Sequence, residues 1–213
     1  MTTRIPIPQL TAASGLVVVV RGSDAAQYPV VIDTLAEAGV RSVELTLSTP
    51  KTLDVLPTLV ERYAASVDVG VGTVTSHPQL LRALDGGARY IVTPVTDPSL
   101  VETSIASGVP ILPGGLTPTE LFSSWSAGAS AVKVFPAGLV GPGYVKDLRG
   151  PFPDIEVVPS GGVDLEAARA WLAAGAAAVS VGGPLLGDAL KGGSMTELAA
   201  RARDFVAAVQ DAR

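Results

Sequence analysis

The apolar positions of this chain fall into short runs, and many of these runs follow a helix-like segment that ends in a small residue and a glycine. Five such junctions precede an apolar run, at Gly39, Gly87, Gly108, Gly128 and Gly175. A glycine just past a helix end adopts the left-handed conformation that caps the helix. Each junction therefore predicts a helix followed by a β-strand.

Three further apolar runs complete a series of eight predicted strands. The eight runs are residues 16–20, 42–47, 67–72, 90–93, 111–112, 131–135, 155–158 and 178–181. Strands that alternate with helices at short, even spacing form a parallel sheet, and eight such units close into a barrel. We therefore predict a single (β/α)8 TIM barrel domain over residues 1–213, with a short N-terminal helix before Gly15 that covers its bottom. An open doubly wound sheet is the alternative, although no Gly-x-Gly-x-x-Gly turn follows the first strand.

Composition narrows the class of partner. The chain is 47% hydrophobic but only 5% aromatic, so we expect a core of Val, Leu, Ile and Ala, as in a buried parallel sheet. The net charge of −5 and the lack of a Lys/Arg run argue against a nucleic-acid or membrane-surface partner. Without cysteine, disulfides and thiol catalysis are excluded. Because no signal-like N-terminus or membrane-length apolar run is present, we expect a cytoplasmic protein.

One lysine lies in a segment that otherwise predicts a buried strand. Lys133 is flanked by apolar residues, whereas the other three lysines lie beside Pro, Asp or Gly in segments of solvated character. Alternation along the strand puts Lys133 on the same face as Ala131 and Phe135. A buried ammonium without a partner is costly, and the neutral amine is a nucleophile that forms a Schiff base with a carbonyl substrate. The alternative is a purely structural ion pair with a carboxylate.

Chemistry in such a barrel takes place at the carboxyl ends of the strands. Glu44 and Thr46 share the strand face opposite Val43 and Leu45, so we expect Glu44 to point into the barrel. An inward glutamate and Lys133 at the same end would form a proton-transfer couple, with an inert buried ion pair as the alternative. The strand ends also carry Arg21, Thr73, Pro94, Phe135 and Ser160. Arg21 is interpreted as a contact for a substrate carboxylate or as a simple loop arginine.

Two glycine pairs, Gly161-Gly162 and Gly182-Gly183, follow the seventh and eighth strands, where barrels of this type commonly bind phosphate. Glycine lets backbone N–H groups approach an anion, and the helices expected over residues 163–174 and 184–190 would add their positive ends. Each pair alone is also compatible with a tight turn. The two pairs together favour a phosphate site.

The remaining polar residues carry less specific signals. His77, the single histidine, lies at an expected helix start and is predicted to be solvated, and Lys146 and Arg149 are predicted surface residues. With one histidine and no cysteine, we expect no bound transition metal. An imine, rather than a metal, would then stabilise a carbanion.

Four segments together resemble one enzyme family. They are Val-Gly-Val-Gly-Thr-Val at 69–74, Ala-Val-Lys-Val-Phe-Pro-Ala at 131–137, Gly-Pro-Gly-Tyr-Val-Lys at 141–146 and Val-Pro-Ser-Gly-Gly-Val at 158–163. In this order they are similar to the 2-keto-3-deoxy-6-phosphogluconate (KDPG) aldolases, a family that also contains 4-hydroxy-2-oxoglutarate (KHG) and 2-keto-3-deoxy-6-phosphogalactonate aldolases. The resemblance covers nearly the whole chain.

The resemblance implies a homotrimeric class I aldolase that needs no cofactor and acts on a small, phosphorylated 2-keto acid. It implies that Lys133 is the Schiff-base lysine and Glu44 the general acid/base. It also implies a pyruvyl pocket around Thr73, Pro94 and Phe135, with the phosphate near Gly161, Gly162, Gly182 and Gly183.

Two positions depart from the family pattern. Phosphogluconate-type members commonly have an arginine where this chain has Ser48, and the phosphogalactonate branch has a short polar residue there. Before Gly161-Gly162, the gluconate branch usually has threonine and the galactonate branch an apolar residue, where this chain has Ser160. The configuration of the sugar acid therefore stays open.

The predicted reaction is cleavage of KDPG to pyruvate and glyceraldehyde 3-phosphate, with cleavage of KHG to pyruvate and glyoxylate as a second activity. One alternative is the phosphogalactonate substrate. Another is a barrel isomerase or epimerase in which Glu44 abstracts a proton and Lys133 only stabilises charge. A third is a non-catalytic barrel that binds a sugar phosphate.

Overall fold

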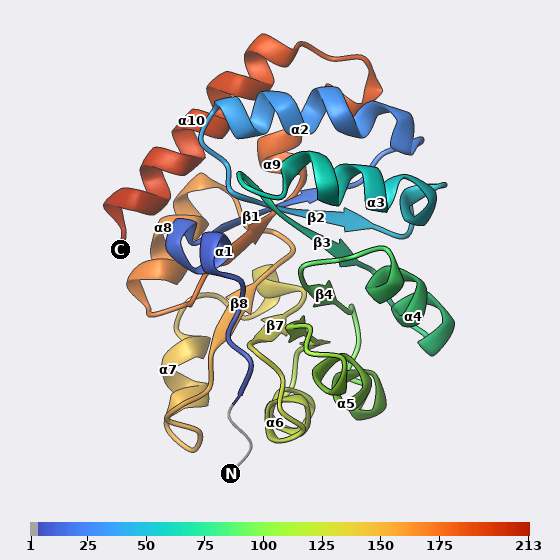
Figure 1. The fold of residues 1–213 in the computed structure, drawn as a ribbon. Helices are drawn as coiled ribbons and strands as arrows, with labels where there is room; N and C mark the ends of the chain where they lie inside the picture. Colours follow the sequence, from blue (N-terminus) through green and yellow to red (C-terminus); the bar gives the residue numbers. More distant parts are fainter. Residues whose placement is uncertain (1–3) are drawn as a thin grey trace.

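A computed structural model describes residues 4–213, and its centre is a curled parallel sheet surrounded by helices (Figure 1). The strands are β1 Leu16–Val20, β2 Ser42–Thr46, β3 Asp68–Gly72, β4 Ile91–Val92, β5 Ile111–Leu112, β6 Gly114–Gly115, β7 Val132–Val134, β8 Val157–Pro159 and β9 Val179–Val181. They form a six-stranded sheet in the order β5-β4-β3-β2-β1-β9 and a three-stranded sheet in the order β6-β7-β8. Each predicted run contains a strand, and the ends differ by at most two residues.

The helices alternate with the strands as the sequence predicts. The α-helices are α1 Gln9–Ser14, α2 Tyr28–Glu37, α3 Thr52–Tyr63, α4 His77–Asp85, α5 Pro98–Ala106, α6 Pro118–Ser126, α7 Tyr144–Arg149, α8 Leu165–Ala173, α9 Gly183–Leu186 and α10 Met195–Asp211. Short 3₁₀ turns are η1 Ala25–Gln27, η2 Ala137–Leu139 and η3 Ala189–Lys191. The five junction glycines all have positive φ, between 75° and 105°, so the predicted helix caps are confirmed.

The helix expected over residues 184–190 is wrong as a single element. It is divided into α9 and η3 at Gly187, whose φ of 56° and ψ of −127° cannot continue a helix. The helix expected over residues 163–174 begins two residues later, at Leu165, because Asp164 caps it by accepting a hydrogen bond from the backbone N–H of Ala167 at 2.8 Å.

The fifth predicted strand is β5, and Pro113 separates it from a second short strand, β6, which the sequence analysis did not predict. β5 pairs with β4, and β6 pairs with β7. Proline has no N–H to donate to a strand ladder, but the carbonyl of Pro113 accepts a hydrogen bond from the backbone N–H of Lys133 at 2.8 Å. At the far edge of the three-stranded sheet, β8 meets β9 through a single parallel bridge between Ser160 and Ser180.

The strands separate two apolar layers. Outward side chains such as Val43, Leu45, Val132 and Val134 pack under the helices in the larger cluster. A smaller cluster fills the inside of the curled sheet with Val17, Tyr90, Val92, Leu112, Ala131, Val158 and Ala178. Ala131 belongs to the inner layer and its neighbour Val132 to the outer one, so the side-chain alternation predicted for this strand is confirmed.

Helix α1 covers one end of this interior, as predicted. It ends at Gly15, which has left-handed φ and ψ. Its buried residue Thr11 uses the backbone N–H and the hydroxyl to bond the carboxylate of Asp68 at the start of β3, at 2.8 and 2.9 Å. Within residues 4–213, no helix combines the length and the apolar character that crossing a membrane requires.

Candidate active site

A cavity of about 310 Å³ opens at the carboxyl ends of the strands. It brings together Lys133 and all of the binding residues that were predicted at strand ends. Its lining includes Arg21, Thr73, Pro94, Phe135, Ser160, Gly161, Gly162, Gly182 and Gly183. These residues come from six segments spread over the chain, and the parallel order of the strands places all of their carboxyl ends at one edge of the sheet.

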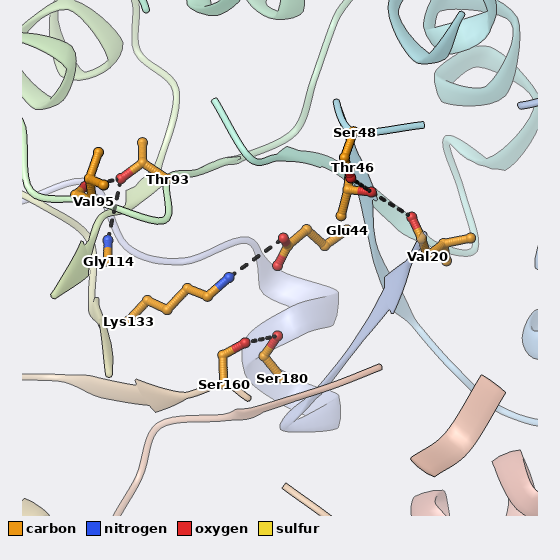
Figure 2. A network of polar contacts seen from close by, with 10 residues as sticks. All are labelled: Val20, Glu44, Thr46, Ser48, Thr93, Val95, Gly114, Lys133, Ser160 and Ser180. Atoms are coloured by element: carbon orange, nitrogen blue, oxygen red, sulfur yellow. Dashed lines mark hydrogen bonds and ion pairs between the residues drawn. The ribbon is translucent and has the colours of Figure 1, made fainter. Parts of the chain in front are cut away.

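Lys133 and Glu44 face one another across this end of the interior (Figure 2). The Nζ atom of Lys133 lies 3.6 Å from Oε1 of Glu44. Lys133 is 7% exposed and Glu44 is 1% exposed. A separation of 3.6 Å is an ion-pair contact that is longer than a hydrogen bond. The two groups are thus close enough to exchange a proton directly after a small movement or through a bound water.

The aromatic ring of Phe135 lies beside the amine. Lys133 Nζ is 5.5 Å from the centroid of that ring, within the range of a cation–π contact. Phe135 lines the cavity but is 39% exposed. Because the two residues are two positions apart on the same strand, the alternation predicted from sequence accounts for their common direction.

Ser160 and Ser180 are polar residues of the cavity wall. Ser160 Oγ donates to Ser180 Oγ at 3.4 Å (Figure 2). Ser180 was missed by the sequence analysis. Its signal was the same as that of Glu44, a polar residue between Val179 and Val181 in an apolar strand, because alternation turns it inward.

Other lining residues were also missed. Val19, Val163 and Pro184 contribute apolar surface to the cavity. They carry no chemical signal in the sequence, so only the fold places them there.

Ser48, at which the chain departs from the family pattern, does not line the cavity. Its side chain is exposed, and its hydroxyl donates to Thr46 Oγ1 at 3.2 Å. Thr46 in turn donates to the carbonyl of Val20 at 3.3 Å (Figure 2). These contacts tie the ends of β1 and β2 together beside Glu44.

Thr73 has an unusual backbone conformation. Its φ is 63°, and Lys51 is the other non-glycine residue with positive φ in the part of the chain that the structure describes. A β-branched residue in this left-handed region costs about 1–3 kcal/mol, and such strain concentrates at functional sites. The strained turn directly after β3 places Thr73 in the cavity wall.

The two glycine pairs form adjacent parts of the cavity wall. Gly161 and Gly162 have φ of 82° and 76°, and a Cβ on Gly161 would lie 3.0 Å from the ring of Phe135. Both positions therefore need glycine. A Cβ on Gly183 would meet no atom within 4 Å, so the wall is open there. Asp164 already caps α8, which leaves the loop N–H groups as the nearer donors for an anion.

The residues predicted to lie on the surface are found there. His77 is exposed at the start of α4, where Nε2 lies 3.2 Å from Thr103 Oγ1. Lys146 is exposed, and Arg149 is partly exposed and pairs with Glu156 at 3.5 Å. Over residues 4–213, no three His, Asp or Glu side chains are grouped so that they could hold a metal ion.

A second polar cluster lies inside the sheet at the end that α1 covers. Thr11 Oγ1 is 2.8 Å from Ser42 Oγ, and Ser42 Oγ is 2.9 Å from the hydroxyl of Tyr90. With Asp68, which Thr11 also bonds, these side chains form one continuous hydrogen-bonded chain. Complete burial raises the pKa of Tyr90 well above the ordinary tyrosine value, and the nearby charges of Glu44 and Asp68 act in the same direction.

Known proteins resemble this chain along most of its length. A family model described as KDPG and KHG aldolase matches residues 7–200. A 2-dehydro-3-deoxy-6-phosphogalactonate aldolase of Escherichia coli is 32% identical over 198 residues, which cover 92% of this chain and 95% of that protein. A 2-dehydro-3-deoxy-phosphogluconate aldolase of Dickeya dadantii is 34% identical over 178 residues, which cover 81% of this chain and 82% of that protein.

A solved structure shows the same fold. It is a KDPG aldolase from Legionella pneumophila with pyruvate captured as a covalent carbinolamine intermediate, and it matches with a TM-score of 0.83 at 24% identity. The match covers 91% of this chain and 95% of that one. By the family model and the similarity to both relatives, the chain belongs to the KDPG and KHG aldolase family and is a carbon–carbon lyase.

Proposed function

We propose that this protein is a class I aldolase that cleaves a phosphorylated 2-keto-3-deoxy sugar acid to pyruvate and an aldehyde phosphate. The observation that carries the proposal is the buried amine of Lys133, which lines the cavity 3.6 Å from Glu44. A primary amine in this position can condense with a keto acid. The carbinolamine captured in the Legionella pneumophila enzyme is the intermediate that such a condensation forms.

In the proposed first half-reaction, a proton passes from Lys133 to Glu44, which leaves a neutral amine and a carboxylic acid. The amine attacks C2 of the keto acid, and a proton moves from nitrogen to the former carbonyl oxygen to give the carbinolamine. Glu44 then protonates the hydroxyl, which leaves as water. The product is an iminium between Nζ and C2, with Glu44 again ionised.

In the second half-reaction, Glu44 accepts the proton of the C4 hydroxyl, directly or through water. The C3–C4 bond breaks, its electron pair moves toward the iminium nitrogen, and the aldehyde leaves. Glu44 protonates C3 of the resulting enamine, and water releases pyruvate from Lys133. The proposed pyruvyl contacts are Thr73, Pro94 and Phe135, which line the cavity beside the amine.

The phosphate is proposed to bind at Gly161, Gly162, Gly182 and Gly183, and Arg21 in the same cavity is proposed to contact the substrate carboxylate. KDPG is our first substrate because Ser160 presents a hydroxyl to the cavity where gluconate-type sequences carry threonine. The phosphogalactonate isomer is the second candidate. It is favoured by Ser48, because the phosphogalactonate branch has a short polar residue at this position. The 32% identity to the Escherichia coli galactonate enzyme also favours it.

For the fold, we propose that the curled sheet closes into a (β/α)8 barrel of one catalytic domain. β6 follows β5 directly after Pro113, and the bridge between Ser160 and Ser180 connects β8 to β9. Each strand then has a neighbour on both sides.

For the assembly, the proposal is a homotrimer. Phe135, Leu139 and Val140 follow β7 and are 39%, 73% and 38% exposed. Large apolar side chains that are exposed within one short segment are typical of an interface. Sedimentation should give a species of three 21.6 kDa chains, and a monomer at micromolar concentration would contradict the trimer.

Borohydride trapping tests the chemistry. With pyruvate present, reduction should attach a pyruvyl-derived group to Lys133, because only a Schiff base is reduced to a stable amine. Mass spectrometry of peptides locates the label, and Lys51, Lys146 and Lys191, all exposed, serve as internal controls. A label on one of these lysines, or none, would refute the Schiff-base mechanism and favour an isomerase or epimerase. The same enzyme is then screened with phosphorylated and unphosphorylated 2-keto-3-deoxy acids by release of pyruvate.

A further inference from the structure

The inner wall beside Glu44 is formed by β3, which has glycine at two successive inward positions, Gly70 and Gly72. A Cβ added to Gly72 would lie 2.5 Å from both Cγ and Cδ of Glu44, and closer still to Oε1. Ordinary side chains do not approach so closely. The carboxylate of Glu44 therefore occupies the space that the missing side chain of Gly72 leaves open.

The next layer down is closed by Tyr90. A Cβ on Gly70 would lie 2.6 Å from Cδ2 of Tyr90 and closer to other ring atoms, so the ring lies flat over this second glycine. The hydroxyl of Tyr90 is fixed by Ser42 at 2.9 Å, and the side chain is fully buried. Glu44 pairs with Gly70 in the β2–β3 register, so the ring and the glutamate side chain are neighbours inside the sheet.

These contacts limit the room around the carboxylate. Gly72 lies on one side of it, and Lys133, which lines the cavity, lies 3.6 Å from it. A methyl group at position 72 would push the carboxylate toward that cavity, because the end of a side chain moves more easily than a strand. The backbone itself tolerates alanine, since Gly72 lies within β3 and is not among the positive-φ glycines of residues 4–213.

On the basis of the aldolase function proposed above, we propose that Gly72 is a positioning residue that acts through Glu44. Its missing side chain holds the carboxylate at the distance from Lys133 that proton transfer requires. Gly72 has no side chain, so it cannot itself exchange a proton with the substrate. Its effect on the rate therefore depends entirely on the presence of the glutamate.

A double-mutant cycle tests this dependence with Gly72→Ala, Glu44→Gln and the combination of both. Removing a general acid/base lowers kcat by about 10²- to 10⁴-fold, which is expected for Glu44→Gln. A misplacement of about 1 Å costs up to about 10²-fold, so Gly72→Ala should lower kcat by about 10- to 100-fold with little change in KM. The combined variant should be no slower than Glu44→Gln alone, because the displaced group is already inactive.

Val71→Ala is the matched control on the same strand. Val71 points outward into the layer under the helices, so its truncation should lower Tm and leave kcat unchanged. If Gly72→Ala retains the wild-type kcat while Glu44→Gln loses activity, the positioning role is wrong and the aldolase assignment stands. If the two losses multiply in the combined variant, Gly72 acts by another route and the inference also fails. A wild-type kcat in Glu44→Gln would instead overturn the acid/base role on which the inference depends.

A stability measurement keeps the test decisive if Gly72→Ala folds poorly. The three atoms nearest to a Cβ added at Gly72 all belong to the side chain of Glu44. Truncation of that side chain should therefore relieve the overlap, and Tm of Gly72→Ala combined with Glu44→Ala should rise above that of Gly72→Ala alone. A Tm that stays equally low would show that the methyl group conflicts with the strand rather than with Glu44.

Discussion

The two ends of the sheet interior contain similar polar groups in opposite conditions. At the end covered by α1, Thr11, Ser42, Asp68 and Tyr90 are buried and linked by hydrogen bonds of 2.8 to 2.9 Å. At the other end, Lys133 lines an open cavity, and its Nζ atom is 3.6 Å from Oε1 of Glu44. The polar groups at the end covered by α1 bond one another. Those at the cavity end remain available to a reactant.

This difference suggests a division of roles within one sheet: the covered end stabilises the fold, and the cavity end holds the candidate reacting groups. A buried polar group that bonds its neighbours at short range stabilises the fold, because it replaces the bonds it made to water. Lys133 and Glu44 are farther apart than a hydrogen bond requires, so each can still exchange a proton with a third group. Substitutions at the two ends should therefore affect different quantities, activity at one end and the free energy of unfolding at the other.

The largest effect is expected at the cavity end for Lys133→Arg. A guanidinium stays protonated and cannot condense with a keto acid, so release of pyruvate should fall to the uncatalysed rate. Tm should change little, since the arginine keeps a positive charge beside Glu44. Lys146→Arg, on the exposed face of α7, is the matched control and should keep wild-type kcat. Measurable turnover in Lys133→Arg would show that Lys133 is not the nucleophile.

The next effect is expected for Gly183→Ala, which alters the cavity wall without meeting any protein atom within 4 Å. A methyl group there should obstruct a phosphate and lower kcat/KM for a phosphorylated acid by about tenfold, or about 1.4 kcal/mol. Cleavage of unphosphorylated KHG should be much less affected. Steady-state kinetics with both substrates checks this. Equal losses for the two would mean that the glycine pairs do not hold the phosphate.

At the covered end, Thr11→Val should reduce stability and leave catalysis intact. The substitution keeps the shape but removes the hydroxyl that bonds Ser42 and Asp68. Ser42 keeps its contact with Tyr90 and Asp68 keeps the backbone N–H of residue 11, so loss of the hydroxyl should cost about 0.5–1.5 kcal/mol in the free energy of unfolding, measured with denaturant. Thr11→Ser, which retains the hydroxyl, should lose less. A drop in kcat at full folding would show that the two ends are not independent.

The smallest effect is a dependence of stability on alkaline pH that Tyr90 contributes. Because burial raises the pKa of Tyr90 in the folded state, both states keep the proton below about pH 10 and the stabilisation is fully present there. At higher pH the unfolded state ionises first, so folding stability falls. Tyr90→Phe cannot ionise, and its Tm should fall less than that of the wild type between about pH 9 and about pH 11. Identical pH curves for the two proteins would contradict the shift.

The candidate site residues were predictable from the sequence because their type conflicts with their surroundings. Lys133, Glu44 and the glycine pairs are unusual within apolar strands or directly after them, and alternation gives their direction. Ser180 carried the same signal and was missed. Val19, Val163 and Pro184 carried no such signal, because an apolar residue at these positions does not reveal whether it lines a cavity.

The order of helices and strands, the face of each strand side chain and the identity of the candidate nucleophile were determined by the sequence itself. These properties depend on local periodicity and on the cost of burying a charge, both of which act over a few residues. The tertiary structure decided that a further strand, β6, follows Pro113, that Tyr90 and Thr11 belong to one hydrogen-bonded chain, and that Glu44 lies in the space left by Gly72. Such contacts depend on atoms that approach within a few ångströms from distant parts of the chain, and no local pattern encodes that separation.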